Sequence, residues 1–163
     1  MRAIISLILV LLVCALAGWL PFESHDVAEL EPVQTLLLTA EQGKLCLQAE
    51  GGECGTGASW DEAVQSFLET SDGAVFLQTA ETVILKGDLP AATQAVVEAR
   101  TLRPATGVYY TQAELDLEQI TEYLHLRGAR CTVSKLRAFR LAGLDAAVPR
   151  LALRQGRPVI LDA

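Results

Sequence analysis

The first 22 residues of the chain are almost entirely apolar, and this stretch limits what the chain can fold into. Residues 4–16 read IISLILVLLVCAL, interrupted only by Ser6, and Arg2 comes before them. A basic residue followed by an apolar core is typical of a secretory signal, and about 20 apolar residues can also span a bilayer. A buried core helix is the less favoured alternative, because such runs rarely begin at residue 3. We therefore predict a hydrophobic signal or anchor helix over residues 1–22.

Two fates of this segment remain open from the sequence. Ala15-Leu16-Ala17 offers the small-x-small pattern of a cleavage site, so the leader can be removed after Ala17. Retained as an anchor, the segment would place Trp19 at the membrane interface. Arg2 precedes the segment and only acidic charges follow it closely, so the positive-inside rule puts the body on the extracytoplasmic side in either case.

Lipid attachment to the leader is not supported by the residues present. A bacterial lipoprotein carries a Cys directly after a Leu-small-small triplet, and here Trp19 follows Leu16-Ala17-Gly18. Cys14 is preceded by Val13, which is too bulky for the position before a modified cysteine. We expect a protein held at the membrane by its leader or released from it, without a lipid.

Charge is distributed unevenly along the rest of the 163-residue chain. Residues 18–126 contain four basic and 18 acidic residues, whereas residues 127–163 contain eight basic residues and two acidic ones. An acidic body repels phosphates, so we predict that the protein binds no nucleic acid. The basic end could contact anionic lipid or an acidic partner, or it could neutralise the acidic body within the fold, which is the more common arrangement.

The order of the expected elements predicts an α+β domain with a mixed β-sheet and helices packed on it. Residues 23–32 are interpreted as a linker and residues 33–163 as one domain, which suits their number. Strand hairpins are expected at both ends of the domain, each with a Gly turn. The expected strands are 33–39, 44–50, 74–78, 82–86, 107–111, 149–153 and 158–161, and the expected helices are 91–102, 114–127, 134–142 and one that begins with the capping box Ser59-Trp60-Asp61-Glu62.

A glycine-rich stretch before the first helix is the most tempting candidate site. Gly52, Gly55 and Gly57 lead to a helix N-terminus, where free N–H groups can bind anions. The spacing is neither that of a dinucleotide fold nor that of a P-loop, and the surrounding carboxylates would repel an anion. We interpret residues 51–57 as a flexible connecting loop.

The sequence assigns no catalytic, cofactor-binding or metal-binding residue. His25 lies in the linker, and His125 lies on the exposed side of its helix without a partner in any known motif. The paired acids, Asp61-Glu62 and the group at residues 114–118, lie where helices begin and carboxylates favour the dipole. We therefore predict that the protein is not an enzyme.

Three cysteines remain outside the leader, and their number leaves one unpaired. Cys46 and Cys54 are separated by a loop, so a disulfide between them is conceivable outside the cytoplasm. Cys46 and Cys131 could equally be small buried residues. The absence of a CxxC pair argues against a zinc knuckle or a thioredoxin-like dithiol.

The order of these features resembles the N-terminal domain of the Ger(x)C family, the C subunits of bacterial spore germinant receptors. Family members have a lipobox leader, an acidic segment with a Glu-Leu pair, a strand hairpin, a Gly/Ser-rich stretch opening a helix, two apolar strands and a proline-marked strand near the end. The corresponding segments here are Leu16-Ala17-Gly18-Trp19, Glu29-Leu30, 33–50, 55–63, 73–85, Arg103-Pro104 to Tyr110, 139–144 and 148–153.

The resemblance implies a short relative of the first domain of those subunits. It implies a membrane-associated, extracytoplasmic and non-catalytic interaction domain that acts in spore germination, with membrane receptor subunits as partners. It implies no site residues and no cofactor. The alternative is a small exported ligand-binding protein with a pocket between helices and sheet near the glycine-rich stretch.

Overall fold

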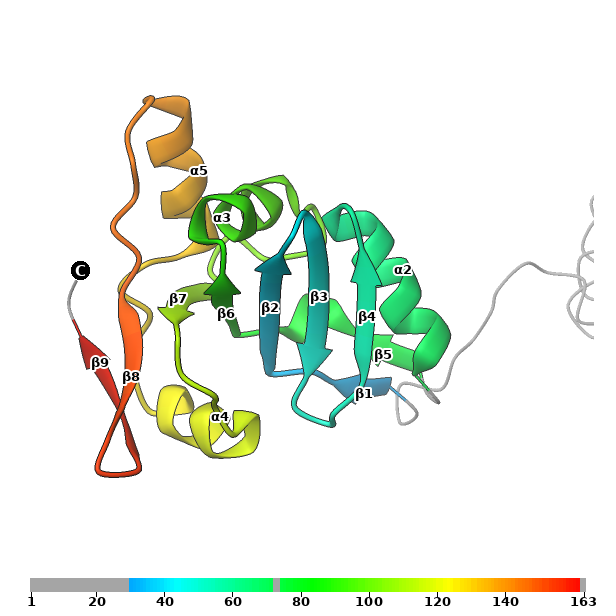
Figure 1. The fold of residues 1–163 in the computed structure, drawn as a ribbon, viewed down its shortest axis with the longest axis horizontal. Coiled ribbons are helices and arrows are strands. Elements are labelled where there is room, and N and C mark those ends of the chain that lie inside the picture. The colour runs from blue at the N-terminus through cyan, green and yellow to red at the C-terminus, as the bar shows by residue number, and fades with distance from the viewer. Residues whose placement is uncertain (1–29, 72–73, 162–163) are drawn as a thin grey trace, which may run out of the picture.

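Four parallel strands form the centre of a seven-stranded mixed sheet in the computed structural model, which describes residues 30–71 and 74–161 (Figure 1). These are β2 (Thr35–Glu41), β6 (Thr82–Gly87), β7 (Gly107–Thr111) and β8 (Arg150–Arg154). Three antiparallel strands extend the sheet at its sides: β3 (Lys44–Ala49) and β4 (Cys54–Gly57) beside β2, and β9 (Arg157–Leu161) beside β8. The order is β4-β3-β2-β6-β7-β8-β9, so the predicted α+β class with a mixed sheet is confirmed.

Both predicted hairpins are present, and their turns explain why these residues form them. Gln42 and Gly43 have φ values of 51° and 75°, and Gln155 and Gly156 have φ values of 53° and 74°. Two-residue turns with positive φ at both positions match the twist of the strands that they connect. A glycine at the second position accepts this conformation without a steric penalty.

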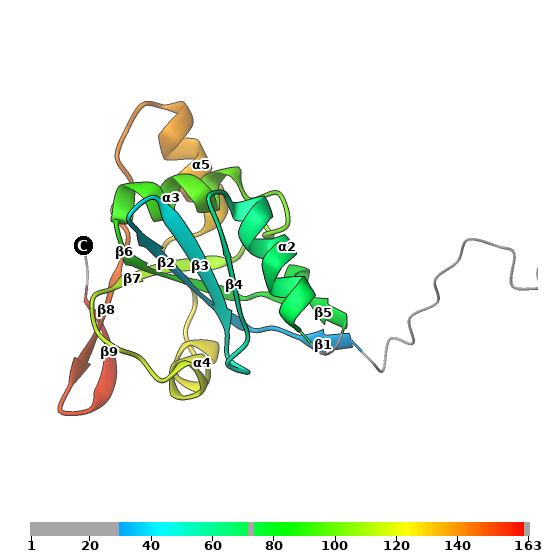
Figure 2. The ribbon, with the colours of Figure 1, turned by 45° about the vertical axis from the view of Figure 1, so that its right-hand side comes forward.

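Helices cover both faces of the sheet. On one face lie α2 (Trp60–Thr70), α3 (Leu89–Glu98) and α5 (Val133–Leu141), and on the other lies α4 (Leu117–His125), as Figure 2 shows. Neighbouring residues of β6 point to opposite faces: Val83 and Leu85 pack in the larger core with α2, α3 and α5, whereas Ile84 packs with α4. The central strands are therefore buried on both sides, as is usual for parallel strands.

In the described residues, each α-helix begins after a residue whose side chain accepts a hydrogen bond from one or two of the free N–H groups. Ser59, Asp88, Asp116 and Thr132 are the N-cap residues, and each accepts a hydrogen bond from the backbone two or three residues on. The capping box predicted at Ser59 is present in modified form, because the Glu62 carboxylate accepts from the backbone N–H of Ala58 at 2.8 Å.

Helix α3 ends four residues earlier than predicted. We expected it to continue to Leu102, but Ala99 has an extended conformation and caps the helix. The guanidinium of Arg137, on α5, donates hydrogen bonds to the carbonyl oxygens of Val97 and Ala99, at 3.1 and 2.5 Å. These bonds satisfy the last carbonyls of α3 from a distant part of the chain, which no local pattern indicates.

Two strand predictions were wrong in part. Residues 74–78 do not form a strand of the main sheet; Ala74–Phe76 form β5, which pairs in parallel with β1 (Leu30–Pro32) in a separate two-stranded sheet, and Leu77–Thr79 form a 3₁₀ turn. β1 occupies the end of the stretch that we interpreted as a linker. The flexible loop predicted over residues 51–57 is also wrong for Cys54–Gly57, which form β4.

The β8–β9 hairpin joins the rest of the sheet through a short contact. β8 pairs with β9 over five residue pairs, but with β7 over only two, Tyr110 with Arg150 and Thr111 with Leu151. The side chain of Leu151 is buried in the smaller core beneath α4 and adds an apolar contact at this junction. The C-terminal hairpin is thus the least connected part of the sheet.

Candidate functional site

Two of the three glycines of the candidate anion site, Gly55 and Gly57, serve close packing instead. A Cβ atom on Gly55 would lie 2.1 Å from the backbone nitrogen of Phe67, and one on Gly57 would lie 2.5 Å from that of Ala63. Both contacts are with α2, so the two glycines let β4 approach the helix backbone. The motif is explained by packing, and the structure gives no sign of an anion site there.

The paired acids noted in the sequence mainly cap helices or form ion pairs. The Asp116 carboxylate accepts from the backbone N–H groups of Glu118 and Gln119, at 3.1 and 3.4 Å. Glu114, which follows β7, forms an ion pair with Lys86 of β6. The Glu62 carboxylate accepts from the backbone N–H of Ala58, as described above. These contacts account for the carboxylates of Glu62, Glu114 and Asp116 without assigning them chemistry.

His125 has an acidic partner that the sequence did not reveal. Its Nδ1 atom lies 3.2 Å from a carboxylate oxygen of Glu81, although the two residues are 44 positions apart. Both side chains are more than half exposed, at 59% and 53%, so the ion pair contributes little to stability. His25, the other histidine, lies outside the described residues.

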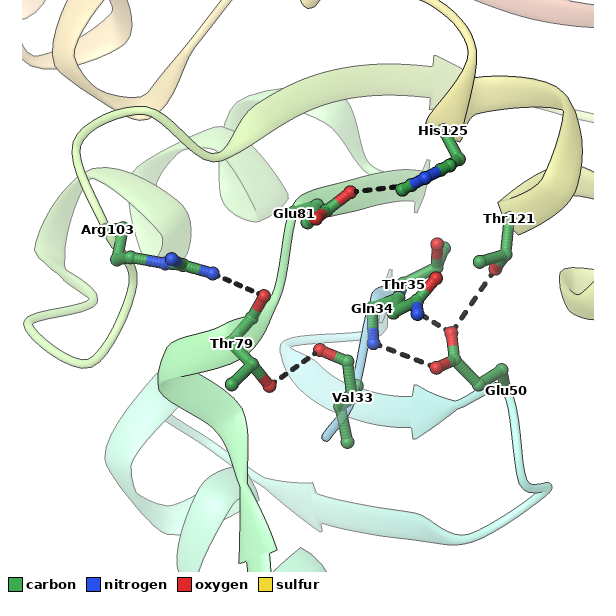
Figure 3. A network of polar contacts seen from close by, with 9 residues as sticks. All are labelled: Val33, Gln34, Thr35, Glu50, Thr79, Glu81, Arg103, Thr121 and His125. Atoms are coloured by element: carbon green, nitrogen blue, oxygen red, sulfur yellow. Dashed lines mark hydrogen bonds and ion pairs between the residues drawn. The ribbon is translucent and has the colours of Figure 1, made fainter. Parts of the chain in front are cut away.

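A polar network surrounds this pair, where α4 meets the beginning of β2 (Figure 3). The Glu50 carboxylate, at the end of β3, accepts from the backbone N–H groups of Gln34 and Thr35 at 2.8 and 2.7 Å. The Thr121 hydroxyl, on α4, donates to the same carboxylate at 3.2 Å. Glu50 thereby connects two strands and a helix, and its charge strengthens each hydrogen bond.

Two cavities open on either side of His125. One, of ≈ 290 Å³, is lined by Glu81, Arg103 and Tyr109, and the other, of ≈ 510 Å³, is lined by Glu50 and Thr121. Arg103 donates to the carbonyl oxygen of Thr79, and Glu50 is engaged as described. Glu81 and Glu50 contact His125 and Thr121 of α4, so these two carboxylates hold α4 against the sheet.

A third cavity, of ≈ 270 Å³, lies beside Trp60 at the carboxyl ends of β2 and β6. Ligands of open α/β sheets commonly bind outside the carboxyl ends of the strands. The indole of Trp60 is buried, and its Nε1 donates to the Thr101 hydroxyl at 2.9 Å. Charged groups at the rim are Lys44, Glu41, Asp88 and Glu98. This cavity lies next to the glycine-rich strand, where a ligand pocket was considered from the sequence.

The C-terminal segment, residues 127–161, carries a different kind of surface. Five of the eight large apolar side chains that are exposed in the described residues lie in it, and Leu141 is 90% exposed. The other four are Phe139, Leu144, Leu153 and Leu161. Single exposed leucines are ordinary, and here they lie on α5, on the loop that follows it and on the β8–β9 hairpin, where a partner can contact them.

Four basic side chains in the C-terminal segment bond to neutral groups. Lys135 donates to the carbonyl oxygen of Arg130, Arg150 donates to the amide oxygen of Gln112, and Arg137 donates to the end of α3. Arg127 donates to the carbonyl oxygen of Tyr123 and lies over its ring, 3.8 Å from the centroid. Within residues 30–71 and 74–161, none of these four side chains forms an ion pair with a carboxylate.

The hairpin turn places two basic residues opposite each other. Arg154 on β8 pairs directly with Arg157 on β9, and both side chains are exposed. Like charges at directly opposed positions destabilise a hairpin. The C-terminal segment therefore keeps positive charge at a position where it costs stability.

The described part of the chain has no group of three side chains placed to ligate a metal ion. None of the helices within residues 30–71 and 74–161 has the length and apolar character that a membrane span requires. Comparison with family models, curated proteins and solved structures found no match to this chain.

Proposed function

We propose that this protein is an extracytoplasmic, non-catalytic interaction domain that acts at a membrane, like the first domain of spore germinant receptor C subunits. Its partners would be membrane receptor subunits of the germinant receptor type. The apolar leader supports the location, because it precedes an acidic body and follows Arg2. The order of sequence features described above supports the kinship.

The observation that carries an interaction role is the character of the C-terminal segment. Basic groups bonded to neutral partners and exposed apolar side chains occur together in this part of the chain. Apolar contacts supply affinity, and complementary charge supplies orientation and a fast encounter. A receptor subunit surface with acidic groups around apolar side chains would match both properties.

The use of the acidic side chains supports a role without turnover. A catalytic carboxylate must be free to reach a substrate or a proton. Glu50, Glu62, Glu114 and Asp116 instead accept hydrogen bonds from the protein's own backbone and side chains.

Capture of partners from spore membranes tests the proposal. The full chain, tagged at its C-terminus, is expressed in a spore-forming bacterium, crosslinked, and purified with its neighbours for mass spectrometry. Receptor subunits of the A and B types should be recovered. The double variant Arg154→Glu/Arg157→Glu should reduce their recovery by about tenfold, because it reverses the charge at the hairpin turn.

Matched variants on the acidic body control for net charge and for apolar loss. Lys44→Glu reverses one charge, as Arg154→Glu and Arg157→Glu each do, on an exposed residue that lines a cavity without residues of the C-terminal segment, and should leave recovery unchanged. Leu141→Ser should reduce recovery, whereas Leu68→Ser, on the exposed face of α2, should not. Equal recovery with all four variants, or no receptor subunits at all, would contradict the proposal.

A second candidate function is the binding of a small ligand, and the cavity beside Trp60 favours it. Its size suits a small polar molecule, and its single lysine beside several carboxylates would select a ligand with an amine or hydroxyl groups. Amino acids and sugars should then raise the melting temperature of the protein. Trp60→Phe keeps an aromatic ring at this position and should weaken that response. If neither amino acids nor sugars raise the melting temperature, the protein is not a binding protein for these two classes of ligand.

A further inference from the structure

Cys46 and Cys54 lie close together on adjacent strands. In the antiparallel pairing of β3 with β4, Cys46 is opposite Thr56 and Cys54 is opposite Gln48, so the two cysteines are diagonal neighbours. Positions separated by two residues project to the same face of a sheet, and diagonal side chains can reach each other across it. The register therefore brings two thiols to one patch of the sheet surface.

The two thiols differ in their access to solvent. Cys54 is exposed, whereas Cys46 is partly buried. Burial raises the pKa of the Cys46 thiol most, and the neighbouring Cys54 thiol raises it further, followed by the carboxylate of Glu41. The influence of Cys54 on this pKa agrees with the proximity that the register gives.

The turn that precedes Cys54 has room to adjust. A disulfide needs Cβ atoms about 3.8 Å apart, which is closer than an ordinary diagonal pair. β4 is a four-residue edge strand, and Gly51 and Gly52 precede it with no heavy atom within 4 Å of where a Cβ would lie. A small shift of Cys54 towards β3 would therefore meet little resistance from the preceding turn.

We propose that Cys46 and Cys54 form a disulfide that fastens the edge strand β4 to β3. This inference rests on the extracytoplasmic location in the proposed function, because disulfides persist in such compartments. The oxidant is a disulfide, either of a thiol oxidoreductase or of a small thiol such as glutathione.

The order of steps follows from exposure. The exposed Cys54 thiolate attacks one sulfur of the oxidant disulfide, forms a mixed disulfide and releases the other oxidant sulfur as a thiolate. The Cys46 thiolate then attacks the Cys54 sulfur, closes the bond and releases the second oxidant thiolate. The two cysteines lose two protons and two electrons, and the oxidant disulfide is reduced to two thiols.

Cys131 provides an internal reference for this chemistry. It is buried in the larger core with α3 and α5, and burial raises the pKa of its thiol. A buried, protonated thiol reacts slowly with disulfides. Cys131 should therefore stay reduced in the folded protein while the other two cysteines pair.

Oxidation of the purified full chain tests the pair directly. The protein in detergent is equilibrated with oxidised glutathione, alkylated and digested after lysine and glutamate, which releases residues 45–50 and 54–62 as separate peptides. We expect these peptides to be joined and two hydrogen atoms lighter than their sum. Oxidation should raise the melting temperature by about 5–10 °C, and Cys46→Ser and Cys54→Ser should each abolish that rise. Unlinked peptides, or glutathione retained on Cys54, would overturn the proposal.

A second measurement separates this inference from the proposed location. Cells that express the full chain are quenched in acid, and thiols are then counted by the mass added with a maleimide reagent in denaturant. We expect two fewer reactive thiols than in a reduced sample, and no such difference in Cys54→Ser. If the cysteines form a disulfide with oxidised glutathione but are found as free thiols in protein from cells, the extracytoplasmic location is contradicted. If they form no disulfide with oxidised glutathione, the disulfide itself is contradicted.

Discussion

The two edges of the sheet solve the same problem in opposite ways. At one edge, β4 lies so close to α2 that Gly55 and Gly57 have no room for a side chain. At the other edge, β9 begins with Arg157 and Pro158, and its Ile160 packs against the smaller core beneath α4. Unpaired edge strands invite other chains, and a covering helix, a proline or a charge each reduces that risk.

The difference separates stability from interaction. The β4 edge is held by packing of α2, whose Phe67 is buried in the larger core. The β9 edge contributes exposed leucines and arginines and is joined to the sheet by two residue pairs. Substitutions at the first edge should therefore change the free energy of unfolding strongly, and those at the second should change it little.

The largest expected effect is at Phe67. Its side chain is 0% exposed, so Phe67→Ala should lower the free energy of unfolding by about 3–5 kcal/mol through lost burial and a residual cavity. Leu153→Ala, at a hairpin residue that is 42% exposed, should change it by less than about 0.5 kcal/mol. Urea unfolding followed by circular dichroism measures both, and similar losses would break the proposed division.

Next in size is the effect of adding one methyl group to β4. Gly55→Ala places a Cβ against the backbone of α2, and should cost about 2–3 kcal/mol because the helix has to move away. Gly51→Ala, in the preceding turn, meets no heavy atom within 4 Å and is the matched control, with an expected change close to zero. Equal urea midpoints for the two variants would show that the close approach is not required.

A smaller effect is expected where α4 is attached. Glu50→Gln replaces a charged acceptor of three hydrogen bonds by an amide and should cost about 1–2 kcal/mol. Glu122→Gln removes an exposed charge on α4 and is the control for Glu50→Gln. It should change the free energy of unfolding by less than about 0.5 kcal/mol. If both variants unfold at the wild-type urea midpoint, the network does not stabilise the domain.

The smallest effect has the opposite sign. Arg154→Glu converts a like-charge pair with Arg157 into an opposite-charge pair, and should stabilise the hairpin by about 0.2–1 kcal/mol. The gain should shrink at high salt because both side chains are exposed. A loss of stability at low salt would mean that this arginine has a structural role.

Most elements of the fold could be predicted from short-range sequence signals. Ser59 begins α2 as predicted, and both Gly turns form hairpins, because caps and turns depend on residues only a few positions apart. β4 was missed because glycines have low β-propensity, and this strand exists through its contact with α2. β1 was missed because its partner, β5, begins 44 residues later in the chain.

The candidate site was less accessible to sequence reasoning. The pairing of His125 with Glu81 depends on how α4 packs, which no spacing reveals. Glu50 looked like an ordinary strand residue, although it joins three elements. The charge asymmetry of the C-terminal segment was visible in the sequence. We predicted that its basic residues neutralise the acidic body within the fold, but Lys135, Arg137 and Arg150 bond to neutral partners.

The short junction between β7 and β8 has a consequence for motion. Releasing the hairpin would break two residue pairs and expose Leu151, while β2, β3 and β6 keep every partner. Amide protons of β8 and β9 should therefore exchange with deuterium through a partial opening that costs less than global unfolding. Such a hairpin can reorient on a partner's surface while the remaining strands stay folded.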